Sequence, residues 1–194
     1  VAVNLYPFRQ TVAKPGVTLA EAIEQIDIGG PSMLRSAAKN HSAVVIVVDP
    51  DDYAEVASDL AAGAVSAERR RALATKVFAH TSAYDAAIHA YLAGADGGDA
   101  LPPALPLLLE RRQVLRYGEN PHQRAALYAT GEPGMGELRQ LHGKELSFNN
   151  LLDVEGALLA IQPFADRPAC AIIKHTTPCG IAVGPTARAA YERA

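Results

Sequence analysis

Short apolar runs alternate with helical stretches along this chain, and that alternation limits the folds it can adopt. Residues 43–48 and 169–173 are uninterrupted apolar runs that include several β-branched side chains. Such runs are expected of strands that are covered on both faces. Because helical stretches separate the runs, the pattern predicts an α/β fold with parallel strands.

Local signals place the remaining elements. Thr18 and Glu21 have capping-box spacing, which starts a helix, and Pro31 suits the first turn of the next one. Thr-Thr-Pro-Cys-Gly at 176–180 indicates a turn or loop. The other predicted elements are strands at 1–8, 105–115, 125–129 and 138–142, and helices at 18–26, 31–40, 49–62, 66–92, 149–164 and 187–194.

A segment rich in glycine and proline separates a mostly helical part of the sequence from a part in which short strands and turns are predicted. Residues 93–103 collect Gly, Pro and Asp, which is typical of a linker. The pattern predicts one domain over residues 1–102 and a second over residues 103–194.

Composition excludes several functional classes. The chain has 194 residues, is 49% hydrophobic and carries a net charge of -3, which argues against a nucleic-acid-binding surface. It has no apolar run of the roughly 20 residues that cross a bilayer, so no membrane partner is expected. Two cysteines, Cys170 and Cys179, give no disulfide framework and favour a reducing, cytosolic location. Both ends fall inside predicted elements, so we expect an internal fragment of a longer protein.

Lys174 and His175 stand where the second apolar strand would leave its sheet. Ligands of open α/β sheets bind outside the carboxyl ends of strands. A cation beside a group that titrates near neutrality suits proton transfer and stabilisation of a developing anion. The alternative is a structural histidine with a solvated lysine.

Two glycines at 29–30 precede a predicted helix that carries Arg35 and Lys39 on one face. Backbone N–H groups at such a helix start can approach an anionic ligand. The spacing alone favours the alternative, which is a loop, a helix cap and two solvated cations, because Gly-Gly-Pro turns are common. Near the first strand, Tyr6 either orients a ligand or is an ordinary core or edge tyrosine.

Polar turns supply two further candidate segments. Arg116 and Tyr117 combine a phosphate-binding guanidinium with a ring that can stack on a purine-like base. Asn150 and Asp153 lie three residues apart at a predicted helix start, where one of them can cap the helix; alternatively, Asn149 or Asn150 contacts substrate amides. A metal site is disfavoured because the six His residues are scattered and the two Cys residues lie too far apart for a Cys-x-x-Cys pair.

Five strings, in this order, resemble the bifunctional purine-biosynthesis family that combines phosphoribosylaminoimidazolecarboxamide formyltransferase and IMP cyclohydrolase. The strings are Asn4-Leu-Tyr-Pro-Phe8, Ile26-Asp-Ile-Gly-Gly-Pro-Ser-Met-Leu-Arg35 with Ala38-Lys-Asn-His41, Arg116-Tyr-Gly-Glu-Asn-Pro-His-Gln123, Gly143-Lys-Glu-Leu-Ser-Phe-Asn-Asn150 and Lys174-His-Thr-Thr-Pro-Cys-Gly180.

The resemblance implies a fold for each part. Residues 1–102 correspond to the end of a methylglyoxal-synthase-like α/β cyclohydrolase domain with the linker. Residues 103–194 correspond to the start of a cytidine-deaminase-like α/β/α formyltransferase domain. Zinc deaminases of that fold carry Pro-Cys-x-x-Cys, but Pro178-Cys179 has no second cysteine, so no zinc is expected.

The resemblance also implies residue roles in two successive steps. In formyl transfer from 10-formyltetrahydrofolate, His175 accepts the proton of the attacking amine and Lys174 stabilises the oxyanion or protonates the leaving nitrogen. Arg116, Tyr117 and Asn150 bind the ribonucleotide. In the ring closure to IMP, Lys39 is the proton donor and acceptor, assisted by Asp27 and Tyr6. Asn4, Ile28 and Gly29 line that nucleotide site.

The resemblance further implies a homodimer and leaves open a monovalent cation near the transfer site. In the family, the phosphate-binding loops precede the segment matched by Val1 and the folate-binding parts follow Ala194. We therefore expect this chain alone to lack both activities. The competing hypotheses are a non-catalytic nucleotide-binding or dimerisation module and a zinc deaminase.

Overall fold

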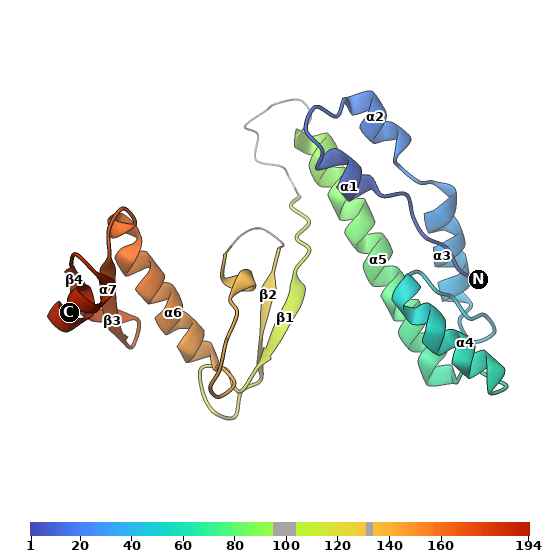
Figure 1. Cartoon of the computed structure of the whole chain (residues 1–194). Helices are drawn as coiled ribbons and strands as arrows, with labels where there is room; N and C mark the ends of the chain where they lie inside the picture. Colours follow the sequence, from blue (N-terminus) through green and yellow to red (C-terminus); the bar gives the residue numbers. More distant parts are fainter. Residues whose placement is uncertain (95–103, 131–133) are drawn as a thin grey trace. The chain divides into compact units, whose positions relative to one another are not determined.

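The computed structural model describes residues 1–94, 104–130 and 134–194 (Figure 1). These residues form two compact units, Val1–Leu108 and Leu109–Ala194, which are considered separately below. Most of the predicted linker at 93–103 lies outside the described residues.

The first unit is mainly helical. The capping box of Thr18 and Glu21 is formed as predicted and starts the second helix. The long helix predicted at 66–92 is also present. The described elements are α1 (Phe8–Val12), α2 (Leu19–Glu24), α3 (Gly29–Lys39), the 3₁₀ helix η1 (Pro50–Asp52), α4 (Tyr53–Ala61) and α5 (Ala67–Gly94).

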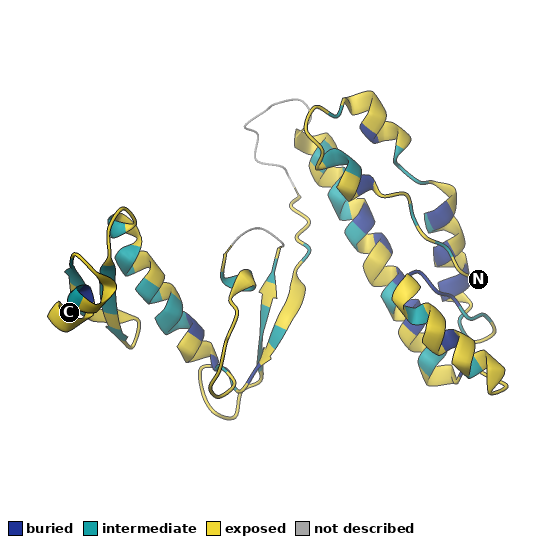
Figure 2. Cartoon of the chain, in the orientation of Figure 1, coloured by how far each residue is buried: buried dark blue, intermediate teal, exposed yellow. Residues whose placement is uncertain are grey.

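Three apolar clusters lie among the described residues of the first unit, and two of them join α3, α5 and the N-terminal segment. In one, Leu34 of α3, Ile46 and Val77 of α5 are fully buried, and Figure 2 shows buried positions along both helices. In the other, Phe8 lies edge-on to the rings of Tyr84 and Tyr91, with centroids 6.2 and 5.7 Å apart. These clusters fix α3 against α5 and hold the N-terminal segment beside them.

The two strands predicted in the first unit are reduced to a single pairing. Ala2 and Val47 form an isolated parallel bridge, and Phe8 already belongs to α1. The run at 43–48 is buried at Ile46, Val47 and Val48, whereas Ala43 is exposed, so the predicted burial is confirmed only for its second half. The predicted ladder of strand hydrogen bonds was wrong, because among the described residues the run pairs only with the segment around Ala2.

The second unit combines two antiparallel hairpins with two helices. The first hairpin pairs β1 with β2, and the second pairs β3 with β4. The predicted strand at 138–142 was wrong: Leu141 is 80% exposed there, and the Gln140 side chain donates to the backbone oxygens of His142 and Lys144. The elements are β1 (Glu110–Leu115), β2 (Ala125–Ala129), η2 (Met135–Glu137), α6 (Phe148–Ile161), η3 (Gln162–Phe164), β3 (Ala169–Lys174), β4 (Thr177–Val183) and α7 (Ala187–Arg193).

The strand predicted before Lys174 is present, but its surroundings differ from the prediction. It pairs antiparallel with β4, and both Ile172 and Lys174 are exposed, so it is not covered on both faces. The predicted loop at 176–180 belongs mostly to β4. Pro178 is accommodated there because the register shifts between Ile172 and Ile173, which leaves Cys179 as an extra, bulged residue.

The fold class is therefore mixed α/β, as expected at the coarse level. Among the described residues, the only parallel pairing is the Ala2–Val47 bridge, and both two-stranded sheets are antiparallel. None of the described helices has the combination of length and apolar character that crossing a bilayer requires.

Candidate functional site

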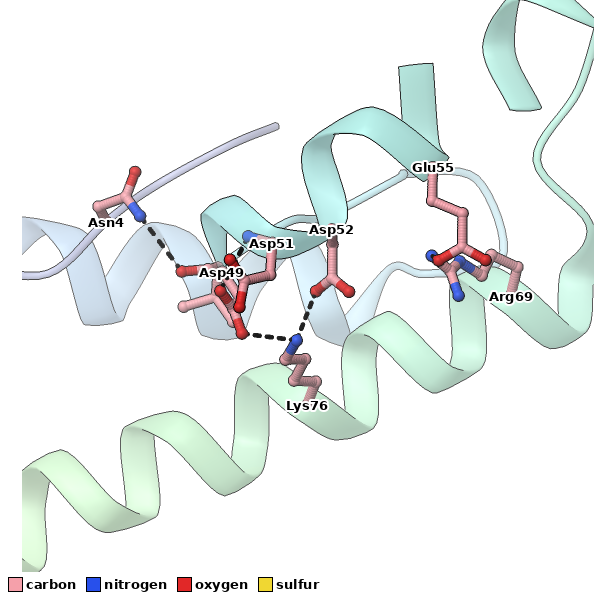
Figure 3. Close-up of polar contacts among 8 residues, drawn as sticks. Asn4, Asp49, Asp51, Asp52, Glu55, Arg69 and Lys76 are labelled. Atoms are coloured by element: carbon pink, nitrogen blue, oxygen red, sulfur yellow. Dashed lines mark hydrogen bonds and ion pairs between the residues drawn. The ribbon is translucent and has the colours of Figure 1, made fainter. Parts of the chain in front are cut away.

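Asn4 is held in one orientation where the first two extended segments end. Its Nδ2 donates to the Val48 backbone oxygen at 3.4 Å, and its Oδ1 accepts from the Tyr53 hydroxyl at 2.7 Å. Figure 3 shows Asn4 next to the Val48–Asp49 turn. The amide is therefore oriented by α4 before any ligand arrives.

Asp27 caps the start of α3. Its Oδ1 accepts from the Gly30 N–H at 2.7 Å, which places a negative charge at the positive end of the helix dipole. A Cβ on Gly30 would lie 2.5 Å from Asp27 Oδ2 and 2.7 Å from Leu5 Cδ2, so a larger residue would require both side chains to shift. Leu5 thereby brings the segment that carries Asn4 and Tyr6 to the same helix end.

Tyr84 of α5 fixes the backbone before this cap. Its hydroxyl accepts from the Asp27 N–H and donates to the Gln25 oxygen, both at 2.8 Å. Burial raises the pKa of Tyr84, and the nearby Asp27 carboxylate raises it further. No local sequence signal marks this contact, because 57 residues separate Tyr84 from Asp27.

A pocket of about 450 Å³ opens beside this helix start. Asp27, Ile28, Pro31, Tyr84 and His89 are among its lining residues. Ile28 is 75% exposed, and Gly29 is exposed as well. The structure thus brings Asp27, Ile28 and Gly29 to one end of α3, where Leu5 also lies; the neighbouring Asn4 amide is directed to Val48 and Tyr53, and Tyr6 is exposed.

Lys39 lies at the opposite end of that helix. It occupies the last turn of α3, ten residues after Gly29, which is about 15 Å along the axis. Arg35, predicted to share a ligand-facing side with Lys39, has its guanidinium 5.7 Å from the centroid of the Phe78 ring. The structure therefore does not bring Asp27 and Lys39 together, and Arg35 packs against α5.

Lys76 anchors an acidic turn that the sequence reading missed. Its Nζ lies 2.7 Å from Asp49 Oδ2 and 2.8 Å from Asp52 Oδ2, as Figure 3 shows. The hydrogen bond that Lys76 donates to Asp49 lowers the pKa of Asp49, and the hydrogen bonds that Lys76 donates to Asp49 and Asp52 raise the pKa of Lys76. Burial lowers the pKa of the neighbouring His80. The local signal was the run of acidic residues directly after the buried segment at 43–48.

Arg116 and Tyr117 form a stacked pair directly after β1. The guanidinium carbon lies 4.8 Å from the Tyr117 ring centroid, and Nη2 donates to the Tyr117 hydroxyl at 3.3 Å. Backbone bonds tie the pair to the start of α6: Arg116 N donates to Leu146 O at 2.8 Å, and Phe148 N donates to Tyr117 O at 3.1 Å.

Asn150 has a clear structural task at that helix start. Ser147 is the N-cap, and its hydroxyl accepts from the Asn150 N–H. In return, Asn150 Oδ1 accepts from the Ser147 N–H at 3.0 Å and from its hydroxyl at 2.9 Å. This reciprocal cap matches the capping prediction for Asn150, whereas Asp153 makes a different contact.

Lys174 and His175 lie at the turn of the β3–β4 hairpin. Lys174 pairs with Thr177, and the two residues between them, His175 and Thr176, have positive φ angles of 53° and 63°. Asp153 of α6 accepts from the Thr176 N–H at 2.8 Å. Both Lys174 and His175 are exposed, so the turn presents them to solvent.

Helix α6 connects the two groups of candidate residues in the second unit. Arg116 and Tyr117 are bonded at its N-terminal end, while the hairpin turn contacts Asp153 and Gly156. These contacts follow the start of the helix by five and eight residues, or about 8 and 12 Å along its axis. One rigid element therefore sets the spacing between the Arg116–Tyr117 pair and the Lys174–His175 pair.

No group of three His, Cys, Asp or Glu side chains suited to a metal ion occurs in residues 1–94, 104–130 and 134–194. Cys170 and Cys179 are free thiols, and Cys179 Sγ donates to the Ile172 backbone oxygen at 3.3 Å.

Both a family profile and individual proteins of known name match this chain. The sequence profile of the family described as AICARFT/IMPCHase bienzyme matches residues 37–194. Proteins named Bifunctional purine biosynthesis protein PurH from Halalkalibacterium halodurans, Acidithiobacillus ferrooxidans and Listeria innocua are 52%, 52% and 53% identical to this chain. Each alignment covers the whole chain, which spans 38% of the length of these relatives.

Proposed function

Because this chain belongs to the AICARFT/IMPCHase bienzyme family, we propose that it contributes to both final steps of de novo IMP synthesis. The first is formyl transfer from 10-formyltetrahydrofolate to 5-amino-4-imidazolecarboxamide ribotide. The second is the dehydrative ring closure of the product. The observation that carries the proposal is the exposed Lys174–His175 turn, fixed to the same helix as the Arg116–Tyr117 pair.

In the transfer step, the ring amine of the ribotide attacks the formyl carbon of the folate. That amine is a weak nucleophile because its lone pair is delocalised, so it must lose a proton as the new bond forms. His175 accepts this proton. Lys174 stabilises the oxyanion or returns a proton to the leaving folate nitrogen. Arg116 binds the phosphate, Tyr117 stacks on the base, and Asn150 contributes its amide N–H₂ while its oxygen stays in the cap.

In the ring closure, the carboxamide nitrogen attacks the formyl carbon of the same molecule and water leaves. Holding the two groups in contact accounts for much of the rate of such an intramolecular step. Asn4, Ile28 and Gly29 bind the nucleotide, and Asp27 anchors its carboxamide. Lys39 transfers the protons, aided by Tyr6.

The separation of Asp27 and Lys39 along α3 argues against both residues reaching the same carboxamide within one copy of this chain, because a proton-transferring group must lie within hydrogen-bond reach of the reacting atom. At about 15 Å along the axis, they cannot exchange a proton directly. Asp27 is also committed to the Gly30 N–H, which suits an anchoring group better than a proton carrier.

Further parts of the proposal concern partners and location. We expect a ribonucleotide and a folate as ligands, a homodimer as the assembly, and the cytosol as the compartment. A monovalent cation near the transfer site fits the proposal, and zinc does not. The alternative is a catalytically incomplete, nucleotide-binding segment of the same fold, which the partial coverage of the relatives favours for the isolated chain.

The test is a chimaera in which this chain replaces the matching 38% of the Halalkalibacterium halodurans relative. His175→Ala should abolish formyl transfer and leave the closure of a supplied formylated ribotide intact. Lys39→Ala should do the reverse. His142→Ala and Lys14→Ala, which remove an exposed His and an exposed Lys elsewhere, are the matched controls. Unchanged rates in both test variants would favour the binding segment, and bound zinc would favour a deaminase.

A further inference from the structure

The turn that carries His175 is unusual for its residue types. Two-residue hairpin turns with positive φ at both positions favour Asn, Asp and Gly. This turn instead uses His175 at 53° and Thr176 at 63°. A β-branched residue at positive φ is disfavoured sterically, and such a conformation persists only where the surroundings impose it.

Hydrogen bonds within the turn contribute to holding this positive-φ conformation. The Thr176 hydroxyl donates to the His175 backbone oxygen at 2.6 Å, and the Thr177 hydroxyl donates to the same oxygen at 3.4 Å. These contacts involve only neighbouring residues. They cannot fix the position of the turn relative to the rest of the unit.

Asp153 provides the contact from outside the turn. Its Oδ1 accepts from the Thr176 N–H at 2.8 Å, across 23 residues of sequence. A hydrogen bond to a carboxylate is about twice as strong as one between neutral groups. The carboxylate touches backbone rather than the imidazole, so it acts on where His175 lies and not on its proton.

Gly156 allows the helix to come close enough for that bond. It lies three residues after Asp153, on the same face of α6. A Cβ there would lie 2.9 Å from the Thr176 backbone oxygen and 3.5 Å from the Thr176 Cα. Helix α6 therefore offers the turn an anionic acceptor at one position and a bare backbone at the next position on the same face.

We propose that Asp153 is a positioning residue for formyl transfer, which holds the Thr176 N–H so that His175 is presented in its left-handed conformation. This inference rests on the proposed role of His175. Asp153 does not touch substrate. Its carboxylate and the missing side chain of Gly156 together fix the turn on α6, at a set distance from Arg116 and Tyr117.

The first experiment measures the turn itself by NMR in the 194-residue chain. Three-bond HN–Hα couplings report the φ angles of His175 and Thr176. Asp153→Ala should change both couplings, and Asp153→Asn should largely keep them because it retains an acceptor oxygen. Glu155→Ala is the matched control, because Glu155 is exposed on the same helix. Unchanged couplings in Asp153→Ala would overturn the proposal.

The second experiment measures catalysis in the chimaera. Asp153→Ala should lower the kcat of formyl transfer by about 10- to 100-fold, the scale expected for misplacing a catalytic group. The KM for the ribotide and the rate of ring closure should change less than about twofold, because neither depends on the turn. A higher KM for the ribotide with an unchanged kcat would contradict the proposal.

Thr176→Gly separates positioning from a chemical role. Glycine adopts positive φ without steric cost, so the double variant Asp153→Ala/Thr176→Gly should recover most of the kcat of Thr176→Gly alone. Failure of this rescue would mean that Asp153 does more than hold the turn. If Asp153→Ala does not fold, Gly156→Ala perturbs the same contact and should lower kcat likewise, with an unchanged kcat refuting the proposal. If His175→Ala itself retains transfer, the proposed function fails, and the couplings still decide whether Asp153 sets the turn.

Discussion

Replacing Tyr84 with Phe tests whether α5 fixes the backbone that carries Asp27. The tyrosine is 7% exposed, and its hydroxyl joins the Asp27 N–H to the Gln25 oxygen. Phenylalanine keeps the ring and its edge-on contact with Phe8, so the change removes two hydrogen bonds and little apolar area. Any loss of stability should therefore come from the two missing hydrogen bonds and be confined to the backbone around Asp27.

The magnitude follows from the number of bonds and from what they leave behind. A net hydrogen bond contributes about 0.5–1.5 kcal/mol, and a buried group without a partner costs about 1–3 kcal/mol. The Asp27 N–H and the Gln25 oxygen are only partly buried and can recruit water. We expect Tyr84→Phe to lose about 1–3 kcal/mol of local stability.

Hydrogen exchange of the Asp27 amide, followed by NMR, is the direct assay. A local loss of about 1–3 kcal/mol corresponds to a protection factor lower by about 5- to 150-fold. Tyr91→Phe is the matched control, because Tyr91 also lies edge-on to Phe8 and no hydrogen bond of its hydroxyl is found among the described contacts. Equal exchange of the Asp27 amide in the two variants would refute the reasoning.

The pH dependence offers an independent check of the same contact. Burial, followed by the charge of Asp27, raises the pKa of Tyr84 above its ordinary value of 10.0. A raised folded-state pKa means that the stabilisation is complete below pH 10 and is lost as the pH rises through the shifted pKa. The free energy of unfolding of the first unit, measured with urea, should therefore fall more steeply above pH 10 in the wild type than in Tyr84→Phe.

Three other predictions concern the core, a helix cap and an ion pair. Leu34→Ala should cost about 2–5 kcal/mol in urea unfolding because the side chain is fully buried, whereas Met33→Ala, 54% exposed, should stay within about 0.5 kcal/mol. Ser147→Ala should destabilise α6 by about 1 kcal/mol through loss of its N-cap, seen as faster exchange of first-turn amides; unchanged exchange would contradict the cap. Lys76 lowers the pKa of Asp49, so their pairing stabilises the fold above pH 3.8 and is lost as pH falls through the lowered value. Both side chains are more than a third exposed, so Lys76→Met should flatten this acid-side loss by less than about 1 kcal/mol, and an unaltered pH profile would argue against the pair.

Helices were predictable where a local signal was sufficient. The Thr18–Glu21 capping box depends on residues three apart, so the sequence contains the whole interaction. The strand predictions were weaker because a ladder needs a partner that the local pattern does not name. The second half of the run at 43–48 has the burial expected of a strand, yet only Val47 has a bridge partner.

The turn after Lys174 shows a different limit of sequence reasoning. Pro178 and Gly180 normally interrupt strands, which is why a loop was predicted there. A bulge at Cys179 instead lets β4 continue past the proline. Gly180 has its own structural reason, because a Cβ would run into the backbone oxygen of Ala194. Neither contact can be deduced from spacing.

Residues of the candidate sites were likewise predictable only where the signal was local. The segments containing Asp27, Arg116 and His175 were recognisable as strings, since each is contiguous in sequence. The groups that position them were not: Tyr84 lies 57 residues from Asp27, and Asp153 acts on a turn 23 residues away. Residues that support a site from another element leave no local signature.

Helix α6 is the element on which the geometry of the second unit depends. Its start is fixed by Ser147 and by the backbone bonds to Arg116 and Tyr117, and its second and third turns hold the His175 turn. Each helical residue adds about 1.5 Å and 100° of rotation. Inserting one alanine between Asn150 and Asp153 would therefore keep the helix but rotate Asp153, Gly156 and the turn that they hold by about 100° relative to the Arg116–Tyr117 pair at the helix start. Formyl transfer in the chimaera should then fall at least as far as in Asp153→Ala, while ring closure, which depends on residues of the first unit, should continue at its normal rate.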